Sequence, residues 1–142
     1  MILRKRMPDR LRPAWEAFHA QAQKVEAARR ALLGCLPIGR VDPAPVPVGL
    51  DLVRDELHAV AKELKAWRVA EVEADWRAVR EAVAEAERAI PRALRTATTT
   101  RELEELLDAV GEVVEPLDAW ADAEQSWLRL RKRTRRWRPK GL

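Results

Sequence analysis

Apolar and polar residues alternate with helical spacing over most of this chain. In residues 13–33 apolar side chains recur every three or four positions, and Pro13 has the fixed φ that suits the first turn of a helix. We therefore predict a first helix over this range, ended by Gly34. Four prolines in residues 36–49 exclude a regular helix and predict an extended strap that leads to the next element.

A longer apolar stripe follows in residues 51–95. Asp51 is a suitable N-cap, and the stripe steps by three and four positions, slips by one residue near Glu71 and then resumes. This pattern predicts a second helix of about 40 residues, close to 60 Å long at 1.5 Å per residue. Pro91 should kink or end that helix, because an interior proline removes a backbone hydrogen bond.

A third helix is predicted over residues 99–136. Thr99 and Glu102 have the spacing of a capping box, and the heptad pattern that follows passes through Pro116 without a change of register. We therefore expect a helix that is kinked at this proline but continuous. The apolar positions of the second and third helices match in an antiparallel hairpin with its turn near Thr98.

These elements predict a single all-α domain over residues 1–142, a coiled-coil-like three-helix bundle. The long antiparallel hairpin would carry the shorter first helix on part of its length. Because the first helix spans only about 30 Å, part of the hairpin should lack a third wall. The third helix also carries a second apolar row, and we predict a partner-binding groove along it, lined by Leu107, Val114 and Leu128.

The two ends of the chain are strongly basic. Residues 1–12 and 129–142 together carry a net charge of +12, whereas residues 13–128 carry −8. We treat residues 1–12 as a basic N-terminal arm and residues 137–142 as a basic tail that continues the cationic run at the end of the third helix. The predicted anion-binding residues of that run are Arg129, Arg131, Lys132, Arg133, Arg135, Arg136, Trp137, Arg138 and Lys140.

Two functions are consistent with these features. The first is a non-catalytic helical adaptor or accessory subunit, whose apolar groove binds a protein partner or a second copy of the chain. The alternative is a nucleic-acid-binding protein without sequence preference, in which the basic tail contacts phosphates and Trp137 stacks on a base. A solvated tail without a specific ligand, an anionic lipid surface and an acidic protein are further interpretations of the same charge.

Candidate catalytic chemistry is sparse. Glu16 with His19 and Asp55 with His58 have the i, i+3 spacing of carboxylate-bridged metal sites, but both histidines lie beside the apolar stripes rather than on them. Cys35 is the only cysteine in the sequence. We therefore predict no enzyme activity, no metal, no cofactor and no small-molecule substrate, and we keep a metal-dependent bundle enzyme as a third hypothesis on the two carboxylate–histidine pairs alone.

The composition bears on where the protein works. No stretch of the sequence approaches the roughly 18 apolar residues that a membrane span needs. A lone cysteine suits a reducing compartment, and the abundance of arginine and alanine is typical of GC-rich bacterial genomes. We expect a cytoplasmic bacterial protein. Five of its six tryptophans, all except Trp137, should fill the core.

Overall fold

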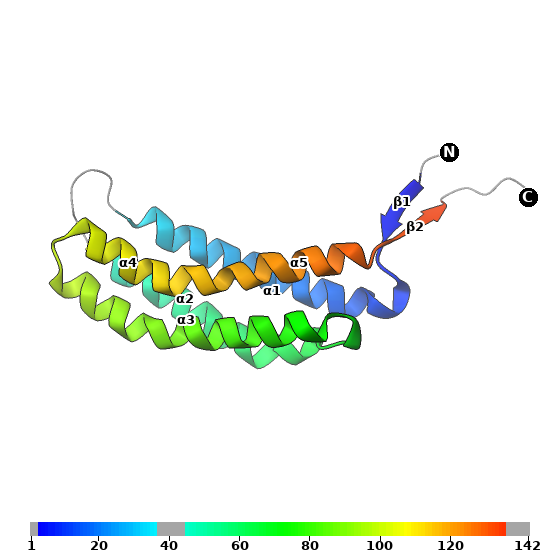
Figure 1. Ribbon diagram of the computed structural model, residues 1–142, viewed down its shortest axis with the longest axis horizontal. Helices are drawn as coiled ribbons and strands as arrows, with labels where there is room; N and C mark the ends of the chain where they lie inside the picture. Colours follow the sequence, from blue (N-terminus) through cyan, green and yellow to red (C-terminus); the bar gives the residue numbers. More distant parts are fainter. Residues whose placement is uncertain (1–2, 37–44, 136–142) are drawn as a thin grey trace, which may run out of the picture.

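Four helical rods run back and forth along one axis in the computed structural model, which describes residues 3–36 and 45–135 (Figure 1). Each rod packs against the next in chain order. The rods are α1 (Arg12–Gly34), α2 (Val46–Glu63), α3 (Glu73–Thr99) and a fourth rod made of α4 (Leu103–Val114) and α5 (Asp118–Arg129). The predicted helical fold class is confirmed, but the three-helix arrangement is wrong because the chain turns once more than expected.

The extra turn divides the predicted helix of residues 51–95. α2 ends in a short 3-10 helix (Leu64–Trp67), the backbone of Arg68 and Val69 is extended, and a second 3-10 turn (Ala70–Val72) leads into α3. No glycine or proline lies between residues 63 and 73. The slip of the apolar stripe near Glu71 therefore marks a corner between two antiparallel helices.

Buried side chains hold this corner through hydrogen bonds to its backbone. The amide of Gln21, on α1, donates to the carbonyl oxygen of Glu63 at 2.9 Å and accepts from the indole Nε1 of Trp67 at 2.9 Å. The indole Nε1 of Trp76, on α3, donates to the carbonyl oxygen of Leu64 at 2.8 Å. Carbonyls at the end of a helix have no partner within it, so these bonds satisfy groups that burial would otherwise leave unpaired.

An aromatic cluster fills the core beside the corner. Phe18 contacts Trp67 edge to face with ring centroids 4.8 Å apart, and Trp120 and Trp127 lie within 6.0 Å of the same ring. Four of the five tryptophans predicted for the core are buried, and Trp15 is half-buried against the cluster. The corner and the first and last helices are thus fixed to one another at the same end of the bundle.

The prolines within the helices do not end them. Pro91 lies inside α3, which continues to Thr99. At Pro116 the fourth rod changes into a 3-10 turn (Glu115–Leu117), but the backbone stays in the right-handed helical region and α5 follows directly. The rod is therefore locally tightened at this proline rather than interrupted.

The capping box predicted from Thr99 and Glu102 does not form at the turn between α3 and α4, where Glu102 is the N-cap residue and no side chain caps the helix. The hydroxyl of Thr100 accepts a hydrogen bond from the backbone N–H of Glu102 at 3.1 Å and donates to the carboxylate of Glu105 at 2.7 Å. The hydroxyl of Thr99 instead donates back into the last turn of α3. α4 accordingly begins at Leu103.

The start of α2 corrects the boundary of the proline-rich strap. The helix begins at Val46 rather than Asp51, with Pro47 in its first turn, where a missing backbone N–H has no cost. Residues 37–44, the rest of the predicted strap, lie outside the described residues. Within the described part of the chain, no helix has the length and hydropathy needed to cross a bilayer.

Both ends of the described chain meet at one pole of the bundle. β1 (Leu3–Arg6) and β2 (Lys132–Arg135) pair as a two-stranded antiparallel sheet beyond the ends of α1 and α5 (Figure 1). The predicted third helix of residues 99–136 is therefore wrong after Arg129, because residues 132–135 form a strand. An even number of antiparallel rods returns the chain to its starting end, which is what allows the two basic ends to pair.

Candidate functional site

The paired strands form a short basic ribbon, which we define as β1 and β2. Its register pairs Leu3 with Arg135, Arg4 with Thr134, Lys5 with Arg133 and Arg6 with Lys132. Six of these eight residues are cationic and none is acidic. The ribbon therefore concentrates six positive charges on two neighbouring strands at one pole of the molecule.

The bundle anchors both strands. After β1, Met7 and Leu11 are buried in the core, 6% and 3% exposed. Before β2, Leu130 is half-buried against the same core, and the backbone N–H of Arg131 donates to the carbonyl of Leu128. These contacts fix where each strand leaves the bundle, so the ribbon projects from a defined position.

Carboxylates neutralise the arginines on the helices and turns below the ribbon. Arg10 pairs with Glu71 of the corner, and Arg12 pairs with Asp9 at 2.6 Å. Glu73 accepts hydrogen bonds from Arg68, the closest at 2.8 Å, and the pKa of its carboxyl is lowered chiefly by these bonds. Arg10, Arg12 and Arg68 are thus each paired with a carboxylate, whereas the strand sequences contain no carboxylate.

The pKa of the Glu71 carboxyl is also lowered. The largest cause is a hydrogen bond with the backbone of Glu71 itself, and the side chain of Arg10 adds to it. This pair joins the segment that follows β1 to the corner between α2 and α3. It therefore contributes to holding the ribbon's first strand in position.

The structure describes five of the nine predicted anion-binding residues, all within residues 129–135. Lys132, Arg133 and Arg135 form β2, and Arg129 and Arg131 lie just before it with exposed side chains. The remaining predicted residues, Arg136, Trp137, Arg138 and Lys140, lie outside the described residues. Residues 132–135 were predicted to end the third helix, but they form a strand that pairs with β1.

Sequence reasoning missed that partner strand as part of the site. Arg4, Lys5 and Arg6 were assigned only to a basic arm, although they stand opposite the residues of β2. The available signal was the excess of cations at both ends of the chain. Only a fold that places both ends at one pole converts that signal into a site.

The predicted partner-binding groove is not an open apolar surface. Val114 is buried in the core, 7% exposed, whereas Leu107 is 43% exposed and Leu128 is half-buried. The fourth rod packs on α3 and, through α5, contacts α1, so α1 supplies part of the wall that the three-helix arrangement lacked. Of the three residues predicted to line the groove, the protein itself thus covers Val114 fully and Leu128 in part, while Leu107 stays exposed.

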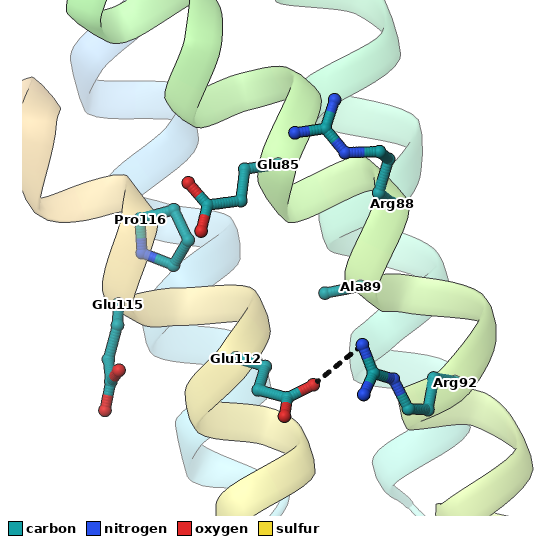
Figure 2. Close-up of a pocket in the computed structure, with 7 residues that line it drawn as sticks. All are labelled: Glu85, Arg88, Ala89, Arg92, Glu112, Glu115 and Pro116. Atoms are coloured by element: carbon teal, nitrogen blue, oxygen red, sulfur yellow. Dashed lines mark ion pairs between the residues drawn. The ribbon is translucent and has the colours of Figure 1, made fainter.

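A charged cleft of about 500 Å³ lies between α3 and the fourth rod (Figure 2). Arg92 and Glu112 reach across it and pair at 3.5 Å, while Ala89 and Pro116 leave room between the helices. The side chains of this pair are 65% and 49% exposed. The cleft therefore has the character of a hydrated helix interface lined by opposite charges.

A second cleft, of about 280 Å³, lies between α1 and α5. Trp120 lines it, and so does Glu124, which occupies a position where the heptad pattern of residues 99–136 calls for an apolar side chain. Arg29 bridges the two helices by pairing with Asp118 at 3.4 Å. The interruption of the heptad is thus explained, because Glu124 is half-buried beside a cleft rather than packed in the core.

The two carboxylate–histidine pairs remain apart from other ligating groups. His19 and His58 are exposed, and His19 packs against the ring of Trp15 at 5.3 Å. Among the described residues, no three or more His, Cys, Asp or Glu side chains gather in a way that could hold a metal ion. Cys35 is half-buried, and its thiol donates to the carbonyl of Ala31 at 3.2 Å.

The described residues thus form a four-helix bundle that carries a basic antiparallel ribbon at one pole. Comparison with protein-family models, with curated proteins and with solved structures finds no match to this chain.

Proposed function

We propose that this protein binds nucleic acid through the basic ribbon, in a non-catalytic role and without reading sequence. The observation that carries the proposal is the strand register, which sets six cations on two adjacent strands without an acidic residue among them. Binding through phosphate neutralisation needs such a concentration of charge and no particular base contact.

The register itself supports an anionic ligand. Lys5 stands opposite Arg133 and Arg6 opposite Lys132, and like charges directly opposite each other destabilise an antiparallel pair. An isolated two-stranded sheet is only marginally stable in water. Phosphates between these cations would replace the repulsion with attraction, so the ribbon is most stable when a polyanion is bound.

The residue types favour phosphate over other anions. Four of the six ribbon cations are arginines, whose planar guanidinium donates two parallel hydrogen bonds to a phosphate. Nucleic acid presents phosphates in a continuous row that a projecting ribbon can follow. An anionic membrane surface and an acidic protein are the competing ligands.

The charge of the helical bundle also favours binding at the ribbon pole. Residues 103–129, which form the fourth rod, contain eight carboxylates and a single arginine at the end nearest β2. This acidic rod repels phosphates along its length. Contact with nucleic acid is therefore confined to the ribbon pole, with the bundle directed away from it.

Salt titration of the affinity tests this function. Six phosphate contacts give a slope of log K against log salt of about −5, and a loss of affinity of roughly 10³-fold between 50 and 200 mM salt. The measurement is fluorescence anisotropy with labelled DNA, repeated with vesicles containing anionic lipid and with an acidic polypeptide. Absence of binding to DNA near physiological salt, or tighter binding to either alternative ligand, would overturn the proposal.

Matched charge variants locate the binding site. The ribbon variant carries four glutamine substitutions in the two strands: K5Q, R6Q, K132Q and R133Q. The control carries four in exposed residues of α3: R80Q, R88Q, R92Q and R95Q. Both lose the same charge, but only the ribbon variant is expected to reduce the salt slope, by about 0.9 for each phosphate that is no longer neutralised. Equal slopes in the two variants would show that net charge rather than the ribbon governs binding.

A protein partner remains a second candidate function, supported by exposed apolar side chains at the opposite pole. Val48 and Leu52, one turn apart on α2, are 62% and 50% exposed, and Leu33 at the end of α1 is 40% exposed. Such side chains are suited to contact a partner protein or a second copy of the chain. Light scattering across a range of concentrations tests the second copy, and V48K/L52K should abolish any association observed.

A further inference from the structure

We infer that the nucleic acid is duplex DNA and that the ribbon enters its major groove. This inference rests on the proposed function and specifies its substrate. The ribbon projects beyond the ends of the helices rather than lying across the bundle (Figure 1). A projecting element can enter a groove, whereas a strand lying across the bundle could contact only an outer surface.

The dimensions of the ribbon match this groove. Four residues in each strand span about 10 Å at 3.3 Å per residue, and the strands lie about 4.8 Å apart. The major groove of B-form DNA is about 12 Å wide and 8.5 Å deep, and it admits a two-stranded ribbon. The ribbon can therefore enter to most of its length before the bundle meets the DNA backbone.

The distribution of charge between the two faces of the ribbon favours a groove over a flat surface. Consecutive residues of a strand belong to opposite faces, and paired residues share a face. The register therefore assigns Lys5, Arg133 and Arg135 to one face, and Arg4, Arg6 and Lys132 to the other. Three cations on each face suit a ligand with phosphates on both sides, as the two backbones that flank a groove provide.

Single-stranded nucleic acid requires a different set of protein side chains. Proteins that bind single strands combine a basic groove with aromatic side chains on which the bases stack. Neither β1 nor β2 contains an aromatic residue. Within its two strands the ribbon thus has the charges for phosphates but no stacking surface, and on this ground we take a ligand whose bases are already paired; Trp137, which was predicted to stack on a base, lies outside the described residues.

Duplex RNA fits the ribbon poorly. The major groove of A-form RNA is deep and narrow, so protein elements do not reach into it. The same ribbon on an RNA duplex would contact phosphates of one groove edge only. We therefore expect duplex DNA to bind more tightly than duplex RNA of the same sequence and length at equal salt.

A variant that keeps all six cations tests whether binding requires the two strands to be paired. Leu3 and Thr134 are the two uncharged residues of the ribbon, and they fall in adjacent cross-strand pairs. In an antiparallel sheet, adjacent pairs alternate between those that exchange hydrogen bonds and those that do not. One of these two residues therefore supplies a backbone N–H to the pairing, and L3P/T134P removes that donor without removing any cation.

The test compares three labelled ligands of about 20 nucleotides per strand, two turns of a duplex, at one salt concentration. Duplex DNA should bind at least about tenfold more tightly than duplex RNA or single-stranded DNA, a difference near 1.4 kcal/mol. A dye that occupies the major groove should compete with the protein, and a dye that occupies the minor groove should not.

L3P/T134P should lose about tenfold in affinity for duplex DNA and little for the single strand, because preorganisation is lost while charge is kept. L3V/T134V is the matched control and should bind as the wild type does.

The outcomes distinguish this inference from the proposed function. If single-stranded DNA or duplex RNA binds as tightly as duplex DNA, or if L3P/T134P keeps full affinity for duplex DNA, groove entry is wrong while nucleic-acid binding stands. If none of the three ligands binds, the proposed function fails as well. Circular dichroism at 222 nm shows whether L3P/T134P keeps the helical bundle, whose helices pack chiefly on one another.

Discussion

Replacing Gln21 by methionine tests why the chain turns at the corner between α2 and α3. Gln21 is the polar side chain buried in the described core, 4% exposed, and it satisfies both the carbonyl of Glu63 and the indole N–H of Trp67. Methionine keeps the length of the side chain but offers neither bond. The substitution leaves the buried indole N–H of Trp67 and the part-buried carbonyl of Glu63 without partners. A fully buried group costs about 1–3 kcal/mol and a partly solvated one costs less, so the expected loss is about 2–4 kcal/mol.

Such a loss is a large fraction of the roughly 5–15 kcal/mol by which a protein of this size is usually stable. In a thermal melt it corresponds to a decrease in Tm of about 10 °C. The measurement is urea unfolding followed by ellipticity at 222 nm. Gln23→Met is the matched control, because Gln23 lies on the same helix and is exposed, and we expect a change within about 0.5 kcal/mol there.

A double-mutant cycle attributes the loss to the bond itself. Trp67→Phe removes the indole N–H and also leaves a cavity. Because this cavity forms with either residue at position 21, its cost cancels in the cycle. The double variant should therefore be more stable than the sum of the two single losses predicts, by about 1 kcal/mol. A Gln21→Met protein as stable as the wild type, or a cycle without coupling, would refute the view that this hydrogen-bond network fixes the corner.

Two further predictions test the packing of the helices. Gly49→Ala should destabilise the protein by about 1–3 kcal/mol in a urea or thermal melt, because its new Cβ would lie 3.0 Å from the backbone of α1. Gly34→Ala, which meets nothing within 4 Å, should be neutral or slightly stabilising, and equal effects at the two glycines would contradict the close approach of α1 and α2. Val114→Asp should destabilise by several kcal/mol because Val114 is buried, whereas Leu107→Asp, at an exposed position, should change stability by less than about 1 kcal/mol. Similar tolerance at both positions would restore the open groove predicted from the sequence.

The helices were largely predictable because their signals are local. The first helix was expected over residues 13–33 and is observed as Arg12–Gly34. Its apolar spacing, its proline in the first turn and the glycine at its end all act within a few residues of one another. The tryptophans assigned to apolar stripes are mostly buried for the same reason.

The corner of residues 64–72 was not predictable from local signals. It contains neither glycine nor proline, and its backbone bonds are made to side chains 42 and 12 residues away. The slip in the apolar stripe indicated that one helix face could not continue. It did not distinguish a slip within one helix from a reversal of the chain.

By itself, the sequence determined the helical segments, most of the core and the basic character of both ends, because periodicity and charge are properties of neighbouring residues. Tertiary structure decided the number of rods, through the bonds that Gln21 and Trp76 make at the corner. The number of rods in turn determined where the two basic ends meet to form the site. Four antiparallel rods return the chain to its starting pole, where the two basic ends lie close enough to pair, whereas three rods would do so only if the first two ran parallel, a direction that the sequence left open.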